Sequence, residues 1–329
     1  MMKKRGSVPN PLFQCAELIF PWLHPTELAS ISSTCKTLSR ISKSITAGRS
    51  SDSSRALENL PIPFVNTVDD QPYEYFVYTP TQTLGLDQPR FRQHWGSVRP
   101  VCSSDLPGTF PTCASATVED ACGCDCQRCD GDLGCPCSFL NSVELTRECG
   151  PSCNCELECG NRLTQGGVSL RLKIVKDRRK GWGLHADQLI RYGQFVCEYA
   201  GELLTTEETR RRQRIYDELK SGGRFCSALL VVREHLPSGK ACLRMNIDAT
   251  RIGNVARYIN HSCDGGNLST ILVRSSGALL PRLCFFASRD IQHDEELTFS
   301  YGDARLSSKG SQCFCGTSGC FGILPSEHT

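Results

Sequence analysis

The sequence predicts a β-rich α+β fold that depends on zinc, and three observations predict it. Ten of the 22 cysteines lie between Cys122 and Cys159, a density that ordinary apolar cores do not use. From residue 168 onward, short runs alternate apolar and polar residues between Gly, Asn and Asp, as strands joined by turns do. One clear helix interrupts these runs, because Thr205 and Glu208 form a capping box ahead of a charged stretch.

Composition restricts the class of protein. The 329 residues suffice for one large domain or several smaller ones. The formal net charge is only +2, so any contact with nucleic acid or histones depends on local patches, and we expect no direct sequence-specific DNA binding. No apolar run is long enough to cross a bilayer, and the N-terminus lacks the apolar core of a secretory signal, so no membrane contact is expected. Without secretion, the cysteines are expected to be thiols that bind metal.

Residues 1–50 are expected to form a helical segment, because apolar residues recur at helical spacing from Leu12 to Ile41. Pro25 restarts a helix after Leu23, as proline does near helix starts. The segment resembles an F-box, which would imply an adaptor of a cullin ubiquitin ligase as its partner. A plain helical hairpin that packs on the rest of the chain explains the pattern equally well.

The next stretch is expected to be extended. Serines crowd residues 42–54 and indicate a solvated linker. Residues 61–110 are rich in proline and carry an aromatic patch around Tyr75, so this part is expected to lie over a neighbouring domain.

The cysteine cluster has the spacing of metal ligands rather than of disulfide partners. Thiols one to three residues apart are too close to bridge each other in most backbones. Zinc takes four ligands, so three ions need twelve positions, which six terminal and three bridging thiolates provide. Such a closed cluster is structural, and Cys122 is surplus to it. The nine expected ligands are Cys124, Cys126, Cys129, Cys135, Cys137, Cys149, Cys153, Cys155 and Cys159.

Two separate four-cysteine sites are the alternative, and they would leave two of the ten thiols spare. The full spacing, C-x-C-x2-C-x5-C-x-C followed by C-x3-C-x-C-x3-C, resembles the pre-SET domain of SET-family protein lysine methyltransferases. A zinc-based module that binds nucleic acid is another alternative, which the near-neutral charge disfavours.

Further motifs resemble the SET domain of the same family. They are Gly-Trp-Gly-Leu at residues 181–184, Glu-Tyr-Ala-Gly-Glu at 198–202, Tyr-Ile-Asn-His-Ser-Cys at 258–263 and Glu-Glu-Leu-Thr-Phe-Ser-Tyr-Gly at 295–302. The resemblance implies a pseudoknot of short sheets that binds S-adenosylmethionine. The expected division is a helical F-box-like segment at 1–50, an extended linker at 51–111, a pre-SET domain at 112–165, a SET domain at 166–302 and a post-SET tail at 303–329.

The strand runs are expected at residues 168–177, 194–204, 228–235, 243–250, 280–291 and 295–301. The Gly-Trp-Gly motif is expected to be a turn after the first of these runs, since glycine allows a backbone to approach a ligand closely.

The resemblance implies roles for single residues. Tyr301 would place its hydroxyl beside the transferred methyl group, and Phe299 would favour addition of two or three methyl groups. A buried structural tyrosine, or two polar core residues at Asn260 and His261, are the plainer interpretations. The residues implied in cofactor binding are Gly181, Trp182, Gly183, Tyr216, Arg257, Asn260, His261 and Phe314.

Three cysteines near the C-terminus leave a zinc ion one ligand short. These are Cys313, Cys315 and Cys320, and the family's post-SET domain implies Cys263 as the fourth ligand. One ion would then tie the tail to the cofactor-binding turn and let Phe314 or Phe321 cover the site.

One position departs from the family pattern. Relatives often carry a tyrosine where this chain has Ala228, and Tyr216 or Phe225 are candidates to compensate. The resemblance as a whole implies a nuclear, chromatin-associated histone-lysine methyltransferase of the plant-like suppressor-of-variegation group, with the histone H3 tail as partner and lysine nine as target. A non-enzymatic F-box-like adaptor with a degenerate SET domain is the alternative.

Overall fold

The structure is a computed structural model that describes residues 11–84, 123–127, 129, 135–137, 145–156, 158–221, 225–235, 242–278, 280–302 and 311–325. Cys122 and the part of the expected linker from 85 to 111 lie outside the described residues. Within the described ranges, no helix combines the length and apolar character that a membrane span needs.

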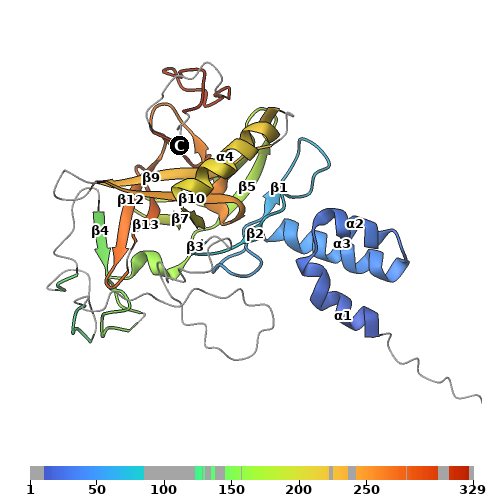
Figure 1. The fold of residues 1–329 in the computed structure, drawn as a ribbon, viewed down its shortest axis with the longest axis horizontal. Coiled ribbons are helices and arrows are strands. Elements are labelled where there is room, and N and C mark those ends of the chain that lie inside the picture. The colour runs from blue at the N-terminus through green and yellow to red at the C-terminus, as the bar shows by residue number, and fades with distance from the viewer. Residues whose placement is uncertain are drawn as a thin grey trace, which may run out of the picture.

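A small helical unit occupies the N-terminal end and lies beside the sheets rather than among them (Figure 1). It consists of α1 (Pro11–Ile19), η1 (Phe20–Trp22), α2 (Pro25–Ser32) and α3 (Lys36–Ser51). Helix α2 begins where Pro25 was expected to restart it, and His24 and Glu27 cap it reciprocally. The apolar core of the helical unit consists of Ala16, Phe20 and Leu28, with Leu23, Ile31, Leu38, Ile41 and Ile45 packed around them.

The expectation of a solvated serine linker at residues 42–54 is wrong. Helix α3 continues to Ser51, and Ser42, Ser53 and Ser54 are buried. For Ser54 the reason lies in Asp52, whose carboxylate accepts hydrogen bonds from the amide and hydroxyl of Ser54 and from a more distant backbone amide. The buried hydroxyls of Ser42 and Ser53 have no hydrogen-bond partner among the described residues. Serine hydroxyls that find such partners can be buried, so serine content alone did not indicate solvent exposure.

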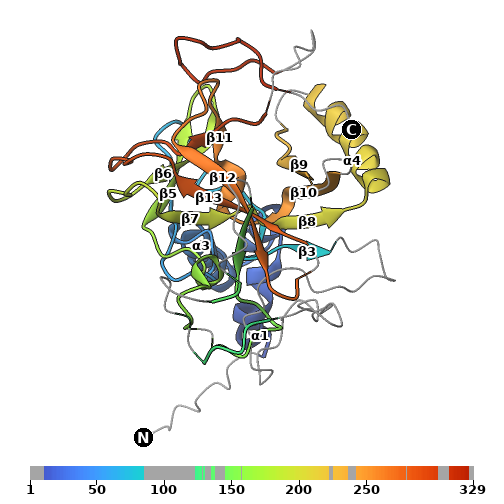
Figure 2. The same ribbon diagram turned by 90° about the vertical axis from the view of Figure 1, so that its left-hand side faces the viewer.

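Four small sheets form the body of the molecule (Figures 1 and 2). The first contains β1 (Phe64–Val65), β5 (Leu172–Asp177) and β6 (Gly181–Ala186). The second contains β2 (Val77–Tyr78), β10 (Cys242–Gly253), β8 (Gly201–Leu204), β3 (Thr83–Leu84) and β9 (Leu229–His235). The third contains β4 (Leu145–Glu148), β12 (Leu268–Ser275), β13 (Arg282–Ala287) and β7 (Phe195–Glu198). The fourth pairs β11 (Asn260–His261) with β14 (Thr298–Phe299).

These sheets surround one continuous apolar core and confirm the expected β-rich α+β class. The short helices η3 (Leu163–Gly166) and η4 (Val255–Tyr258) connect the strands. Helix α4 (Thr206–Ser221) is the helix that the capping pattern predicted, and the Glu208 amide donates to the Thr205 hydroxyl over 3.2 Å. Arg212 fixes α4 to the second sheet through Glu202 at 2.6 Å and Asp248 at 2.9 Å.

The segment that follows the helical unit contributes strands to these sheets. Strands β1, β2 and β3 each pair in parallel with a strand from the later part of the chain, namely β5, β10 and β8. Residues expected within an extended linker are therefore hydrogen-bonded along the second and first sheets.

A buried ion network ties the third sheet together next to the cysteine cluster. The Arg282 guanidinium, 1% exposed, lies 3.0 Å from the Glu148 carboxylate and 3.3 Å from that of Glu198. Glu148 also accepts from the amide and hydroxyl of Thr164. These contacts join β13 to β4 and β7. Glu148, the last residue of β4, directly precedes Cys149 in the chain.

Replacing Arg282 by methionine is expected to lower the free energy of unfolding by about 3–5 kcal/mol, because two buried carboxylates would lose their cation. Denaturant unfolding measures the change. The matched control is Arg191→Met, which breaks an exposed pair with Asp290 and is expected to cost less than about 1 kcal/mol. Equal costs for the two variants would contradict the assignment of Arg282 as the central cation.

Candidate functional site

Two motifs that lie far apart in the sequence meet in a parallel pair of very short strands. Strand β11 pairs with β14, so Asn260 lies opposite Thr298 and His261 opposite Phe299. The Asn260 amide donates to the backbone carbonyl of Trp182 over 3.3 Å and to the Glu296 carboxylate over 2.8 Å. Three of the four expected motifs are thus in direct contact.

The Gly-Trp-Gly motif is a strand rather than the expected turn. Gly181 to Gly183 begin β6, which pairs along its length with β5. The Trp182 ring packs edge-on against Phe64, with centroids 5.1 Å apart, while its backbone carbonyl accepts from Asn260. A Cβ atom at position 183 would lie 2.9 Å from the Glu296 carboxylate, so a larger residue there would force that side chain to shift.

His261 joins the motif pair to the C-terminal tail. Its Nδ1 atom accepts a hydrogen bond from the Tyr301 amide over 3.2 Å, which leaves the proton on Nε2. That nitrogen lies 3.2 Å from the Cys263 sulfur, to which it can donate. Burial lowers the pKa of His261, so the neutral ring is favoured.

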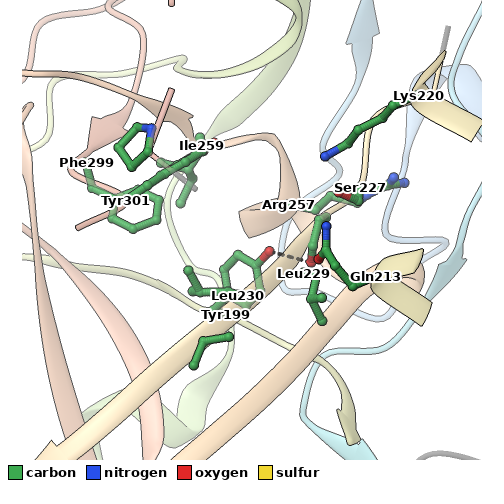
Figure 3. Close-up of a pocket in the computed structure, with 13 residues that line it drawn as sticks. Tyr199, Gln213, Lys220, Ser227, Leu229, Leu230, Arg257, Ile259, Phe299 and Tyr301 are labelled. Atoms are coloured by element: carbon green, nitrogen blue, oxygen red, sulfur yellow. Dashed lines mark hydrogen bonds between the residues drawn. The ribbon is translucent and has the colours of Figure 1, made fainter. Parts of the chain in front are cut away.

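A pocket opens between α4, the start of β9 and the β11–β14 pair (Figure 3). At one end of the pocket, aromatic and aliphatic side chains lie together (Figure 3). At the other end lie the polar or cationic side chains of Lys220, Ser227, Gln213 and Arg257, and Tyr199 lies between the two ends (Figure 3). The lining residues are Tyr199, Gln213, Lys220, Ser227, Ala228, Leu229, Leu230, Val231, Arg257, Ile259, Phe299, Tyr301 and Pro325.

Tyr301 and Phe299 form the aromatic end of this pocket. Their rings lie 5.0 Å apart, and Phe299 packs edge-on against Phe285 at 4.8 Å. The Tyr301 hydroxyl donates to the carbonyl of Ile259 over 2.9 Å. Burial raises the pKa of Tyr301, so its phenol stays neutral and acts as a hydrogen-bond donor.

Tyr199 is a pocket residue that the sequence interpretation did not identify. Its hydroxyl donates to the carbonyl of Ala228 over 2.8 Å, so an aromatic wall stands next to the position where relatives often carry a tyrosine. Neither Tyr216 nor Phe225, the expected substitutes, is among the described residues that line the pocket. The signal was available, because Tyr199 belongs to the Glu-Tyr-Ala-Gly-Glu motif.

Two residues expected at the cofactor have other partners. The Tyr216 hydroxyl donates to Asp248 over 2.7 Å, and burial together with that carboxylate raises the pKa of Tyr216 to about 12. The Phe314 ring lies under the Arg179 guanidinium at 4.7 Å, while Phe321 is 60% exposed. Within the described part of the tail, Pro325 rather than either phenylalanine lines the pocket.

The clustered thiols lie close enough together to hold metal. Eight of the nine expected ligands form three groups of four, in each of which all sulfur atoms lie within 4.8 Å of one another. Cys124 and Cys129 each belong to two of the groups, as a thiolate that bridges two ions does, whereas Cys149 belongs to all three. The ninth, Cys126, packs against this cluster. The three groups are Cys124–Cys129–Cys135–Cys149, Cys124–Cys137–Cys149–Cys153 and Cys129–Cys149–Cys155–Cys159.

The surroundings of the cluster suit bound cations. Burial raises the pKa of the Cys149 thiol, so a thiolate there needs nearby positive charge. Arg162 supplies part of it, since its guanidinium lies 3.4 Å from the Cys155 sulfur. Soft thiolate donors in groups of four are typical zinc ligands. The residues therefore fit zinc, which they could hold without an open position for substrate.

A fourth group of sulfurs lies at the tail. Cys263, Cys313, Cys315 and Cys320 have all sulfur atoms within 4.8 Å of one another and could also hold zinc. The backbone supports this arrangement, because the Cys313 amide donates to the carbonyl of Gly322 and closes a small hairpin. The four-sulfur group connects this hairpin to the β11–β14 pair.

Comparison with known proteins shows the family to which the chain belongs. The SET domain family matches residues 181–302. Histone-lysine N-methyltransferase SUVR3 of Arabidopsis thaliana is 57% identical over 326 residues, which are 96% of this chain and 92% of that protein. The H3 lysine-9 specific methyltransferase SUVH3 of the same plant is 31% identical over 301 residues. The match covers 82% of this chain and 42% of SUVH3, which is longer.

Solved structures share the fold. The methyltransferase domain of human SETMAR superposes with a TM-score of 0.63 at 28% identity, covering 84% of this chain and 97% of that domain. Arabidopsis thaliana SUVH6 in complex with SAM gives a TM-score of 0.62 at 26% identity, covering 92% and 59%. KRYPTONITE in complex with DNA, an H3(1-15) peptide and SAH gives 0.60 at 25% identity, covering 83% and 53%. The chain belongs to the SET-domain family of histone-lysine N-methyltransferases.

Proposed function

We propose that this methyltransferase modifies lysine nine of histone H3 and that the pocket between α4 and the β11–β14 pair receives the lysine. The observation that carries the proposal is the meeting of Tyr301 and Phe299 with the Asn260–His261 strand at the aromatic end of that pocket. The names of SUVH3 and the H3 peptide bound to KRYPTONITE support the choice of target.

S-adenosylmethionine, when bound, supplies an electrophilic methyl group; the lysine nitrogen forms the new C–N bond as the C–S bond breaks and its electron pair returns to sulfur. Free lysine has a pKa of about 10.4, so the site must favour the neutral amine. The apolar walls at Phe299 and Ile259 do so by desolvation. The cations Arg257 and Lys220, which line the same pocket, add repulsion against an ammonium group.

The remaining residues would position the reactants. Tyr301 offers a neutral hydroxyl at the reacting end, and the carbonyl of Ile259 already orients it. Asn260, fixed between the Trp182 carbonyl and Glu296, and His261 would hold the methyl donor against β6. Phe299 has no hydroxyl to retain a water molecule, which favours two or three rounds of transfer. Positioning of this kind contributes much of the rate of such reactions.

We further propose that three zinc ions occupy the clustered thiols and one the tail group, so that the metal is structural. The domain limits proposed from the motifs are 112–165 for the pre-SET, 166–302 for the SET and 303–329 for the post-SET part. A role in chromatin implies a nuclear location. The F-box-like resemblance of the helical unit has gained no support and stays a prediction.

The target is tested with radiolabelled S-adenosylmethionine and H3 tail peptides. We expect label on the native peptide, little label when lysine nine is replaced by alanine, and full label when lysine four is replaced instead. Mass spectrometry of the product counts the methyl groups, and two or three are expected. Label that persists on the peptide without lysine nine would overturn the target but leave the methyltransferase assignment intact.

A further inference from the structure

Arg257 combines burial with an incomplete set of partners. Its side chain is only 5% exposed although it lines the pocket. Its guanidinium lies 3.3 Å from the Glu74 carboxylate and stacks on the rings of Phe76 and Tyr258 at 4.8 and 5.0 Å. The buried Nε atom has no hydrogen-bond partner among the described residues. An unsatisfied buried donor at a pocket wall indicates a group that binds ligand.

Glu74 and Phe76 come from outside the SET-domain match, which begins at residue 181. They lie directly before β2, whose pairing with β10 fixes them: Val77 lies opposite Ile252, and Tyr78 opposite Gly253. Gly253 precedes η4, the helix that carries Arg257, so both sides of the ion pair are attached to the same end of β10.

The neighbouring side chains in this segment attach it to the helical unit. Tyr73 and Tyr75 alternate with Glu74 and Phe76, as residues on opposite sides of an extended chain do. The Arg49 guanidinium of α3 donates to the Tyr73 hydroxyl over 3.0 Å and lies over the Tyr75 ring at 4.8 Å. It also donates to the carbonyls of Pro21 and Leu23, at 2.8 and 2.7 Å, within its own unit.

We propose that Glu74 and Phe76 are positioning residues of the active site, which orient Arg257 toward the methyl donor, and that Arg49 anchors them to the helical unit. Without Glu74, a buried cation would lack its partner and its rotamer would no longer be fixed. The segment from Tyr73 to Tyr78 thus extends the donor site into the N-terminal part of the chain. This inference rests on the proposed function and on the cofactor-binding role that the family resemblance implies for Arg257.

Glu74→Gln is expected to raise KM for S-adenosylmethionine about tenfold, as the loss of a charge-assisted contact does, while kcat and KM for the H3 peptide change little. Glu74→Asp keeps the charge, so its KM for S-adenosylmethionine should lie between those of the unchanged protein and Glu74→Gln. It replaces Glu74→Gln as the test variant if the glutamine variant folds poorly. The control Asp290→Asn removes a carboxylate that pairs with an arginine and a backbone amide away from the pocket lining, and should leave all three constants unchanged.

The double variant Glu74→Gln with Arg257→Lys should be no worse than Arg257→Lys alone, because the two residues act as one unit. Arg49→Met should shift KM for the donor in the same direction, whereas Arg40→Met, exposed on the same helix, should not. If Arg257→Lys leaves KM unchanged, both its proposed role and this inference fail. If Arg257→Lys raises KM but Glu74→Gln does not, or the two effects add fully, only the inference is overturned.

Discussion

Turnover is expected to fall by about 100-fold or more in Tyr301→Phe, while binding of S-adenosylmethionine stays within about threefold of the unchanged protein. The substitution removes one oxygen from the aromatic end of the pocket. The ring contacts with Phe299 at 5.0 Å and His261 at 5.2 Å do not involve that oxygen and should persist. The fold should thus be retained while the hydroxyl that we propose to lie beside the transferred methyl group is lost.

Single-turnover rates and donor binding, measured on the same preparation, separate these two effects. Tyr192→Phe makes the same chemical change on a tyrosine that is 74% exposed, so its rates should match those of the unchanged protein. Tyr199→Phe removes the hydroxyl of the other tyrosine in the pocket, whose donation to Ala228 is structural, and should cost less than Tyr301→Phe. Turnover of Tyr301→Phe within threefold of normal would remove Tyr301 from the reaction.

Short-range chemistry made several features predictable from the sequence. The spacing of the clustered cysteines and of Cys313, Cys315 and Cys320 predicted groups of sulfurs, because ligands of one ion must converge whatever the rest of the fold does. The capping pair at Thr205 and Glu208 predicted α4 for a similar reason, since a helix start is decided within one turn.

Features that depend on distant partners could not be derived in this way. Strands β1, β2 and β3 are two residues long and exist only because strands more than a hundred residues later pair with them. Glu74 gives no local signal, since its function follows from a contact with Arg257. Gly-Trp-Gly suggested a turn because glycine permits one, whereas here Gly183 lies in a strand and lets the Glu296 side chain approach closely.

Removal of zinc from the tail group is the second large effect that we expect. Cys263→Ser should lower the zinc content from about four ions per chain by one, and weaken binding of the methyl donor by at least about tenfold. The reason is that the Cys263 sulfur contacts His261 Nε2, and His261 Nδ1 accepts a hydrogen bond from the Tyr301 amide. The same tail also supplies Pro325 to the pocket lining. Metal analysis and donor titration measure both quantities, and Cys242→Ser, at an exposed thiol, is the control.

Substitution in the nine-cysteine cluster should have a different effect from substitution in the tail group. The difference tests whether the cluster stabilises the fold and the tail group stabilises the donor site. Cys149 belongs to all three groups of four and directly follows Glu148, which pairs with the buried Arg282. Cys149→Ser should therefore release more than one ion and unfold β4 and its neighbours, whereas Cys263→Ser should leave the unfolding midpoint near normal. A strong chelator should produce both effects in full, because structural zinc contributes about 10–16 kcal/mol of apparent binding free energy. Stripped protein that kept its circular dichroism and its affinity for the donor would show that neither sulfur group holds the fold or the site together.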